Sequence, residues 1–478
     1  MFKEILEDNS YVKNSKGGLY YKTTYNSNLD LFTLATREAN ERNLIKLFSN
    51  AINEDKLIAT AILLYNLDIR GGKGERRVFK ILFHQLCLND KGLALKVLYL
   101  IPDLGRYDYI LETENTPLWK NTVDIIKSQL EKDLENDNPS LLAKWLPSVR
   151  THNVNNKLAI KLARELNISI KDYRKTLTLL RNKINIVEHN ITNKTYSEIK
   201  YENVPSIAMN KYFNLFTRND NERFSSYIND VKSGTKKINA SVIEPYQIIK
   251  GCLNDGNDVL DELWKNQTDV LEGNDTNALV IADTSGSMWC YNMLPITTAL
   301  GLAIYIAERN KGIFHNTFIN FSENPSFQKL KGDTLSEKLK SIDYSNWGAS
   351  TNIDKALNLI LKASMKSDET ECPSHLIIIS DMEFDVSIDN IPNFKYWKKK
   401  YSENNLKMPK VVFWCVSPNQ AGIPITKNED GAIIISGFSA KIFKNILNID
   451  KYSQVEAMLE ILDKYIKLIK EEQKVTSK

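Results

Sequence analysis

The hydrophobic pattern of this 478-residue chain changes near Asn277, and this change divides the sequence into two halves. Before it, apolar residues recur at spacings of three and four, which is the period of amphipathic helices. After it, short apolar runs such as ALVIAD, HLIIIS and KVVFWC alternate with helical stretches of about 10–15 residues. Strands of this kind are typical of a parallel sheet covered on both faces. The sequence therefore predicts an all-α first half followed by an α/β half with a doubly wound parallel sheet.

These patterns also predict where one segment ends and the next begins. Residues 1–28 are polar and aromatic without a clear period, which favours an extended arm. Residues 29–273 carry helical patterns and no strand-like alternation of useful length, so we expect a helical domain. An irregular helical-repeat array is one form that this domain can take, because such repeats can be very degenerate. Residues 274–449 hold the alternating strands and helices, and residues 450–478 are expected to form a C-terminal helix and tail.

Composition narrows the class of protein. Hydrophobic residues make up 42% of the chain and charged residues 26%, which is ordinary for a soluble globular protein. The five cysteines are far apart and none lies in a CxxC pair, which argues against a disulfide framework and against a thiolate zinc site. The N-terminus lacks the apolar region of a secretory signal, and no stretch is read as a membrane span. We therefore expect a cytoplasmic protein.

Polar residues follow two of the predicted strands and occupy one further loop. Asp283, Ser285 and Ser287 lie in DTSGSM, directly after the first strand. Thr351 lies in the loop NWGASTNID, and Asp381 follows the strand HLIIIS. Loops at the carboxyl ends of parallel strands meet at one edge of the sheet, and their oxygens suit Mg²⁺, Ca²⁺ or Mn²⁺ rather than zinc. The alternative is that these side chains only cap helices and close turns.

The order and spacing of these residues resemble the metal-ion-dependent adhesion site (MIDAS) of von Willebrand A domains, whose sheet is Rossmann-like. The resemblance implies that Ser285, Ser287 and Thr351 bind the ion directly, and that Asp283 and Asp381 bind it directly or through water. Mg²⁺ is the expected ion, with Ca²⁺ and Mn²⁺ as alternatives. A coordination position is left open, and the expected partner is a protein that offers an acidic group to it.

Strings in both halves resemble a second family. In chain order they are DIRGGKGER, AKWLPSVR, DYRKTLTLLR, VPSIAM, KKINA, SDMEFD and SGFSA. Over about residues 29–449 the chain resembles the domain of unknown function 2828 family, which pairs a helical region with a C-terminal von Willebrand A domain. That architecture is similar to the Ro autoantigen (TROVE) family, in which a ring of helical repeats binds small structured RNAs and RNA ends. This second likeness is one of architecture.

The loop RGGKGER is a candidate phosphate site. Arg70, Lys73 and Arg76 would supply its positive charge. A Walker loop is excluded, because Gly74 follows the lysine where Ser or Thr is needed, and because a helix rather than a strand precedes the loop. The alternative interpretation is that the paired glycines stop one helix and that another begins after them.

A second group of cations lies within residues 141–200. This segment contains twelve Lys and Arg against four Asp and Glu, a balance of +8, whereas the whole chain carries +4. The cations at near-helical spacings include Lys157, Lys161, Arg164, Lys171, Arg174, Lys175 and Arg181. Tyr173 is interleaved with them. Such a face predicts contact with the phosphate backbone of RNA, and we expect no binding to DNA. The alternative is an ordinary solvated helix face.

Three functions are compatible with these patterns. The leading hypothesis is a non-enzymatic, metal-dependent binding or scaffold protein that grips an acidic group of a partner and binds RNA in the manner of Ro. The second is a protein-only assembly factor without nucleic acid. The third is a metal-dependent hydrolase, although the five scattered histidines form no recognisable catalytic motif.

Overall fold

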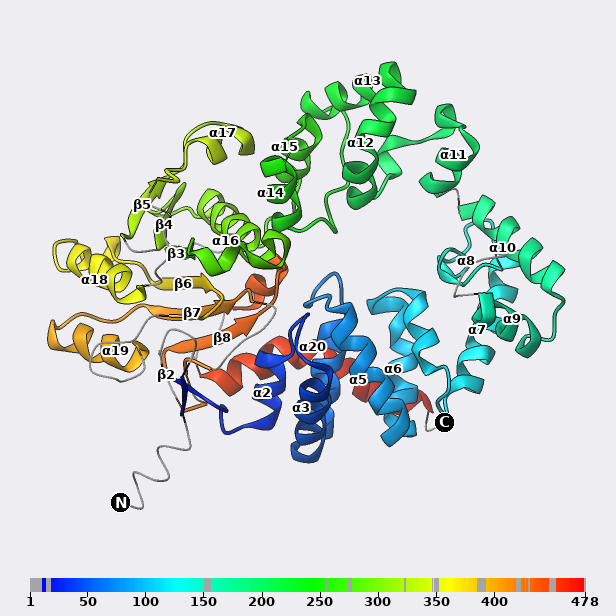
Figure 1. The fold of residues 1–478 in the computed structure, drawn as a ribbon, viewed down its shortest axis with the longest axis horizontal. Coiled ribbons are helices and arrows are strands. Elements are labelled where there is room, and N and C mark those ends of the chain that lie inside the picture. Colours follow the sequence, from blue (N-terminus) through cyan, green and yellow to red (C-terminus); the bar gives the residue numbers. More distant parts are fainter. Residues whose placement is uncertain are drawn as a thin grey trace.

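The structure, a computed structural model, is helical in its first half and mixed α/β in its second, as the periodicity predicts. Figure 1 shows helices that begin beside the sheet, curve away from it and return to it. The residues that the structure describes are 11–13, 19–149, 156–184, 186–254, 256–273, 277–321, 324–345, 347, 352–384, 393–417, 423–425, 427–428, 430–446 and 453–476.

Helices make up most of the first half. The α-helices are α2 (Ser27–Leu34), α3 (Glu41–Glu54), α4 (Lys56–Leu67), α5 (Arg76–Asn89), α6 (Lys91–Leu104), α7 (Trp119–Glu135), α8 (Leu142–Trp145), α9 (Asn156–Glu165), α10 (Ile170–Ile184), α11 (Val187–Asn193), α12 (Ser206–Asn219), α13 (Asn221–Lys232), α14 (Pro245–Asn254) and α15 (Asp258–Lys265). The 3₁₀ turns are η1 (Tyr107–Thr113), η2 (Tyr196–Glu198) and η3 (Tyr201–Asn203). Side chains of Asn40, Asp55 and Asp90 accept first-turn N–H groups and so define where α3, α4 and α6 start.

Helix α4 lies at the centre of the N-terminal helices. Every residue from Ala59 to Leu67 is buried, and a helix buried all round needs neighbours on every side. Helices α3 and α5 supply two of them, and the C-terminal helix α20 (Gln454–Thr476) supplies another. The segment that the sequence predicts as a C-terminal helix and tail is therefore helical and packs among the first helices of the chain.

The second half forms a six-stranded sheet with the order β5–β4–β3–β6–β7–β8. Its strands are β3 (Ala278–Asp283), β4 (Thr317–Phe321), β5 (Ser326–Lys329), β6 (His375–Ser380), β7 (Lys410–Cys415) and β8 (Ala432–Ser436). All neighbours pair in parallel except β5, which pairs antiparallel with β4. This edge strand was not predicted, because SFQK is too short to show alternation. The strand order reverses between β3 and β6, and open α/β sheets bind ligands at such a point.

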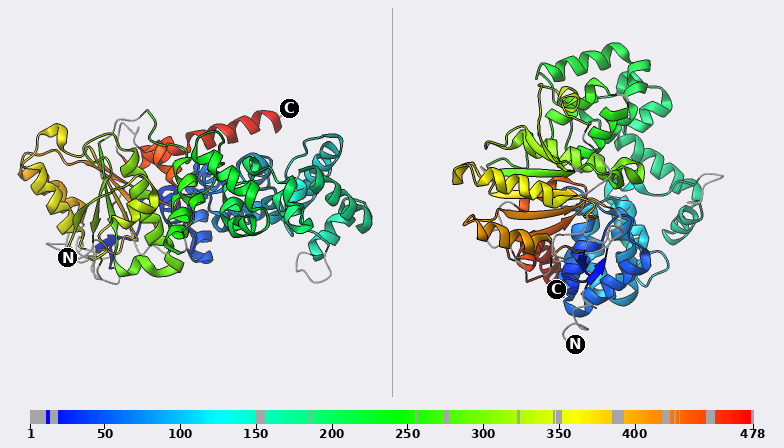
Figure 2. Two further views of the ribbon diagram at one scale, coloured as in Figure 1. Left: turned by 90° about the horizontal axis from the view of Figure 1, so that it is seen from above. Right: turned by 60° about the vertical axis from the view of Figure 1, so that its left-hand side comes forward.

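Helices cover both faces of the sheet (Figures 1 and 2). The helices of this half are α16 (Cys290–Arg309), α17 (Leu335–Lys340), α18 (Ile353–Ser364) and α19 (Asn393–Glu403), with 3₁₀ turns η4 (Gly286–Trp289), η5 (Glu369–Glu371) and η7 (Ala440–Asn445). Alternate residues of β3 enter different cores. Val280 and Ala282 share a core with α16, whereas Leu279 and Ile281 share one with α18 and α19. The sheet is thus wound on both sides, as expected.

By length and composition alone, one helix among the described residues would be able to cross a membrane. It is α16 together with the turn before it, Gly286–Arg309, and the sequence interpretation had not singled it out. In the structure 72% of its most apolar window is buried within the protein. The helix packs on β3, β4 and α14, so its apolar character serves the core beneath the sheet.

The N-terminal arm contains two strands and contacts the α/β half. Strands β1 (Tyr11–Lys13) and β2 (Leu19–Tyr21) form an antiparallel hairpin. Tyr21 and Ile423 exchange backbone hydrogen bonds of 2.9 and 3.1 Å. The segment expected as an extended arm thus contains two short strands, which the sequence did not reveal because three-residue strands are too short for a detectable period.

Candidate metal centre

The end of β3 places Asp283 and two serines at the carboxyl edge of the sheet. Asp283 and Ser285 are fully buried, and Ser287 is half-buried. The Ser285 backbone N–H donates to Asp283 Oδ1 at 2.9 Å, which closes a tight turn. The hydroxyl oxygens of Ser285 and Ser287 lie 3.1 Å apart. Alternate residues of this turn therefore direct their oxygens to one place.

Asp381 follows the neighbouring strand β6 and is also buried. Between the two carboxylates lies Ser380, the last residue of β6. Its hydroxyl donates to Asp283 Oδ2 at 2.6 Å and lies 3.5 Å from Asp381 Oδ1. Sequence reasoning missed Ser380, although its position at the strand end, directly before Asp381, was a usable signal.

Two neighbouring buried carboxylates need a compensating positive charge or a bound proton. Burial and then the charge of Asp381 raise the pKa of Asp283 to about 7. A divalent ion would supply the compensating charge, and hard carboxylate and hydroxyl oxygens suit Mg²⁺ or Ca²⁺. Within the described ranges no group of three or more His, Cys, Asp or Glu lies together, so serine hydroxyls would have to complete the donor set. Thr351, the remaining predicted ligand, lies outside the described residues.

The N-terminal arm holds the loop that carries Asp381. Met382 adopts a left-handed backbone with φ of 65°. The Tyr20 hydroxyl donates to the Met382 carbonyl and accepts from the Phe384 N–H, the latter at 3.0 Å. The Asp381 carboxylate accepts from the Glu383 N–H at 3.0 Å. Tyr20 is therefore a positioning residue for the second carboxylate, and sequence reasoning missed it.

The turn that carries Ser287 continues into strained backbone. Tyr291, Asn292 and Met293 have φ values of 51°, 57° and 64°, all left-handed. For residues other than glycine this conformation costs about 1–2 kcal/mol each. The Lys250 ammonium donates to the Asn292 carbonyl at 3.1 Å and helps to hold the turn. Strain of this kind tends to gather at functional sites.

The loop RGGKGER has a structural role at its lysine. Lys73 is buried, and its ammonium donates to the Phe32 carbonyl at 2.6 Å and to the Ser436 hydroxyl at 2.8 Å. Burial lowers the pKa of Lys73 to about 8. Because its donors are used inside the protein, the structure does not support Lys73 as a phosphate ligand. Arg70 and Arg76 stay exposed, with Arg70 donating to a backbone carbonyl at 3.2 Å.

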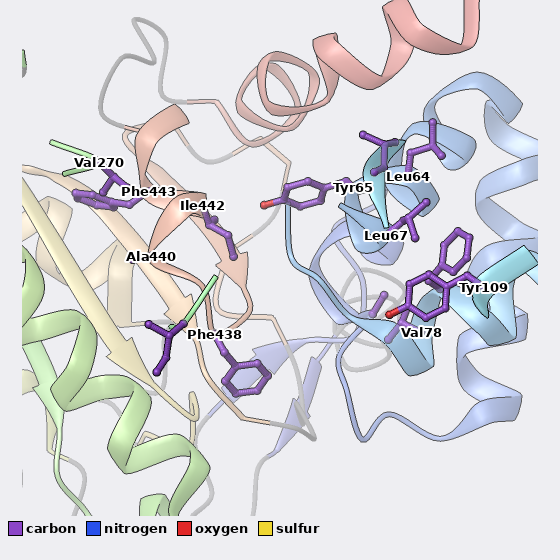
Figure 3. Packing of buried hydrophobic residues seen from close by; sticks show 14 of the residues in the cluster. Leu64, Tyr65, Leu67, Val78, Tyr109, Val270, Phe438, Ala440, Ile442 and Phe443 are labelled. Atoms are coloured by element: carbon purple, nitrogen blue, oxygen red, sulfur yellow. The ribbon is translucent and has the colours of Figure 1, made fainter. Parts of the chain in front are cut away.

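Two of the sequence strings that carry the family resemblance, RGGKGER and SGFSA, meet at a seam between the helical half and β8. Besides the Lys73–Ser436 contact, the Arg37 guanidinium pairs with Glu75 at 3.1 Å and lies 4.6 Å from the centre of the Phe438 ring. Figure 3 shows the side chains at this seam, with Tyr65 on α4 and Phe438 beyond the end of β8. These strings therefore join the two halves of the molecule.

Some residues of the predicted basic face are exposed, and the others are bonded or buried within the protein. Lys171, Arg174 and Lys175 are exposed on α10, and Lys157 and Arg164 are exposed on α9. Within the described part of the chain, Lys171, Arg174 and Lys175 form no ion pair and line an open depression on that helix. These five side chains remain available to a phosphate backbone.

The other members of that face are used within the protein. Lys161 pairs with Glu114 at 3.1 Å. The Arg181 guanidinium donates to two backbone carbonyls near α8 at 2.8 and 2.9 Å. Tyr173 is buried, so it is not available to stack on a base. Helical spacing alone did not distinguish these residues from their exposed neighbours.

Two family models match parts of this chain. Residues 151–281 match the family described as Domain of unknown function (DUF2828), and residues 277–478 match Domain of unknown function (DUF7788). The expected resemblance to the first family is confirmed for residues 151–281, and the α/β half with α20 matches the second.

A relative matches almost the whole chain. "Uncharacterized protein L728" of Acanthamoeba polyphaga mimivirus is 30% identical over 509 aligned residues. The alignment covers 96% of this chain and 88% of the mimivirus protein. With this identity over nearly the full length of both proteins, the chain belongs to the same family as mimivirus L728.

Proposed function

We propose that this protein is a non-enzymatic, metal-dependent binding protein whose α/β half is a von Willebrand A-type domain with a MIDAS. The observation that carries the proposal is the convergence of Asp283, Ser285, Ser287 and Asp381 at the carboxyl edge of the sheet, where the strand order reverses. The proposed ion is Mg²⁺, with Ca²⁺ and Mn²⁺ as alternatives that suit the same oxygens. The proposed compartment is the cytoplasm.

In this proposal the chain's own oxygens hold one side of the ion. Thr351 adds a further hydroxyl from a loop outside the described residues. Magnesium usually keeps coordination positions for water or for a partner's oxygen, so an acidic group of a protein partner can complete the shell. Binding of this kind needs no proton transfer.

A hydrolase is less well supported than a binding protein. His375 opens β6, so it lies about 16 Å along the strand from the carboxyl edge. Burial lowers the pKa of His375 to about 4, which keeps it neutral. The other described histidines, at positions 84, 189 and 315, contact groups in η1, in α11 and at the end of α16 rather than the metal centre. Within the described ranges, this edge therefore offers carboxylates but no histidine base.

The metal proposal is tested by Asp283→Asn. We expect millimolar Mg²⁺ to raise the melting temperature of the parent protein and to leave the variant unchanged. An ion that binds only the folded state adds about 2.7 kcal/mol of stability at a hundredfold excess over its Kd. Asparagine keeps the shape of the side chain and can still accept hydrogen bonds, but it removes the charge that attracts the ion. Thermal unfolding in Mg²⁺, Mn²⁺, Ca²⁺ and EDTA measures the difference.

Asp368→Ala is the matched control, because Asp368 is an exposed carboxylate of the same α/β half and forms no side-chain cap. This variant should retain the full response to Mg²⁺. A parent protein whose melting temperature is the same in EDTA and in all three ions would contradict the proposed metal centre.

RNA binding is a second proposed activity of the helical half, which we propose to be TROVE-like. Helices α3 to α6 pack in succession, each on the next, which supports an array of helical repeats. Lys171, Arg174 and Lys175 project from one exposed face of α10 and have no ion-pair partner in the described ranges. Such a face can follow the phosphates of a small structured RNA or an RNA end. A protein-only assembly factor is the alternative.

Reversing the charge of Lys171, Arg174 and Lys175 to Glu should weaken RNA binding and flatten its salt dependence. The slope of log affinity against log salt should fall by roughly 2, because each of three lost phosphate contacts contributes about 0.7 for single strands. Hairpin and single-stranded RNAs of equal length should lose affinity alike, since backbone contacts carry no sequence information. Filter binding at several salt concentrations measures both effects.

The control carries the same change of charge on the α/β half, at Lys362, Lys366 and Lys407, which are also exposed. Its RNA affinity should stay close to that of the parent. If the two triple variants lose affinity equally, only net charge matters and α10 is not the RNA face. If the parent protein does not bind RNA, the protein-only assembly factor is the remaining alternative.

A further inference from the structure

A groove beside the N-terminal arm encloses about 540 Å³. It lies between α2 and α3, which pack against each other (Figure 1). Ser27, Asp30 and Leu34 of α2 form one wall at helical spacings of three and four, and one face of α3 forms the opposite wall. Lys22 and Thr23 of the arm close a third side. We call this cavity the arm groove, and its size is typical of small-molecule sites.

The floor of the arm groove is apolar. Leu34, Ala39 and Leu47 are half-buried. Each packs against one of the two hydrophobic cores, and each also lines the groove. A small apolar body that lies on this floor is removed from water, which favours its binding.

The walls of the groove offer hydrogen-bond donors. Lys22 and Lys46 are exposed there, and within the described residues their ammonium groups have no ion pair or hydrogen bond. The side-chain amides of Asn43 and Asn50 also have no partner in the described part of the chain. Two ammonium groups and two amides that line the same cavity are therefore available to a ligand.

Asp30 is the one acidic side chain among the described residues that line the groove, and the arm already uses its carboxylate. Asp30 Oδ1 accepts the Thr24 N–H and the Thr24 hydroxyl, both at 2.7 Å, and Oδ2 accepts the Thr23 hydroxyl. Two ammonium groups against one carboxylate leave a net charge of +1 in the lining. The groove therefore favours an anion, and hydrogen bonds from an ammonium group to a phosphate or carboxylate are stronger than neutral ones.

We propose that the arm groove binds a small organic anion. Its phosphate or carboxylate accepts hydrogen bonds from Lys22 and Lys46 and from the amides of Asn43 and Asn50, and its body lies on the apolar floor. This site shares no residue with the candidate metal centre or with the exposed cations of α10. Tyr20, which positions the second carboxylate of the metal centre, lies two residues before Lys22. A ligand in the groove therefore joins to α3 the same arm that Tyr20 joins to the sheet.

Isothermal titration calorimetry of the full-length protein with phenyl phosphate tests the proposal. EDTA is present throughout, so that no divalent ion can hold the phosphate elsewhere. We expect phenyl phosphate and benzoate to bind. Inorganic phosphate, which lacks the apolar body, should bind more weakly, and benzyl alcohol, which lacks the charge, should not bind.

The double variant Lys22→Met, Lys46→Met should bind phenyl phosphate about tenfold more weakly than the parent, because two charge-assisted hydrogen bonds from exposed ammonium groups are lost. Methionine keeps most of the apolar stem of lysine. Without ligand the variant should melt at the temperature of the parent, since exposed charges contribute little to stability.

Lys171→Met combined with Lys175→Met is the matched control. It removes two charges by the same substitution from exposed side chains of α10, where cations also lack ion-pair partners in the described ranges. This control should bind phenyl phosphate as the parent does.

Several results would overturn the proposal. Equal losses of affinity in the two double variants would show that net charge alone attracts the anion. Equal affinities for phenyl phosphate and inorganic phosphate would show that the apolar floor takes no part. If neither phenyl phosphate nor benzoate binds at millimolar concentration, the groove is not a site for organic anions. Because the titrations contain no free divalent ion and no RNA, these results leave the proposed metal centre and RNA face to their own tests.

Discussion

Gly72→Ala should lower the free energy of unfolding by about 3 kcal/mol, because the new methyl group has no room. A Cβ at this position would lie 2.2 Å from the Tyr65 carbonyl oxygen and 3.0 Å from that of Asp68. Both are backbone atoms at the end of α4, so neither can rotate away. Gly71→Ala is the matched control, because its closest contact, at 3.1 Å, is the end of the Asp68 side chain. It should cost less than about 1 kcal/mol.

The effect at Gly72 is large because the same backbone atoms organise the seam. The Gly72 N–H donates to the Asp68 carbonyl at 3.1 Å, and the Lys73 N–H donates to the Tyr65 carbonyl at 3.0 Å. The Asp68 carboxylate in turn accepts the Tyr465 hydroxyl of α20 at 3.0 Å. A backbone shift that admits the methyl group therefore disturbs the contact with α20 and the placement of the buried ammonium.

Urea unfolding followed by circular dichroism measures both glycine variants. The expected result is a lower midpoint for Gly72→Ala with an unchanged slope, and a midpoint near that of the parent for Gly71→Ala. Equal midpoints for the two variants would show that the end of α4 moves freely, contrary to the packing described above.

The sequence predicts those features of the fold that are encoded over short stretches. Apolar runs such as ALVIAD and HLIIIS are long enough to identify strands, and their alternation with helices predicts a parallel sheet. The same reasoning places Asp283, Ser285 and Asp381 at one edge, because each follows a recognisable strand or turn. Local spacing was therefore sufficient to bring the described part of the candidate metal centre together.

Features that depend on distant segments were not predictable. The Tyr20 contact with Met382 spans 362 residues, and the Tyr465 contact with Asp68 spans 397. Neither tyrosine lies in a pattern that identifies its partner. Lys73 shows the same limit, because a lysine between glycines is expected in an exposed loop. Its burial arises only when distant parts of the chain close over it.

Local signals were also absent where the backbone is unusual. Three consecutive left-handed residues before the long part of α16 include no glycine, the residue that normally indicates such a conformation. Helical spacing likewise placed buried Tyr173 on the same predicted face as exposed Lys171 and Arg174. Periodicity shows which residues share a face of a helix, but it does not show which neighbours cover part of that face.

Leu462→Asp in α20 should prevent the N-terminal helices from folding stably. Leu462 is fully buried in a core that continues from α2 through the sheet to α20. Loss of a buried leucine side chain costs about 2–5 kcal/mol, and an unpaired buried carboxylate adds several more. The sum is comparable with the whole stability of a typical domain, about 5–15 kcal/mol. Limited proteolysis with mass spectrometry should therefore show cleavage within α2 to α6.

Lys470→Asp is the control, because Lys470 is exposed on the same helix, so the introduced carboxylate stays in solvent. This variant should resist the protease as the parent does. If residues 27–104 of Leu462→Asp stayed protected from the protease, α20 would pack on the N-terminal helices without being needed for their folding. If instead both the N-terminal helices and the sheet became sensitive together, the shared core would unfold as one cooperative unit. That result is the one we expect, because the Lys73 and Arg37 contacts across the seam are lost when either side unfolds.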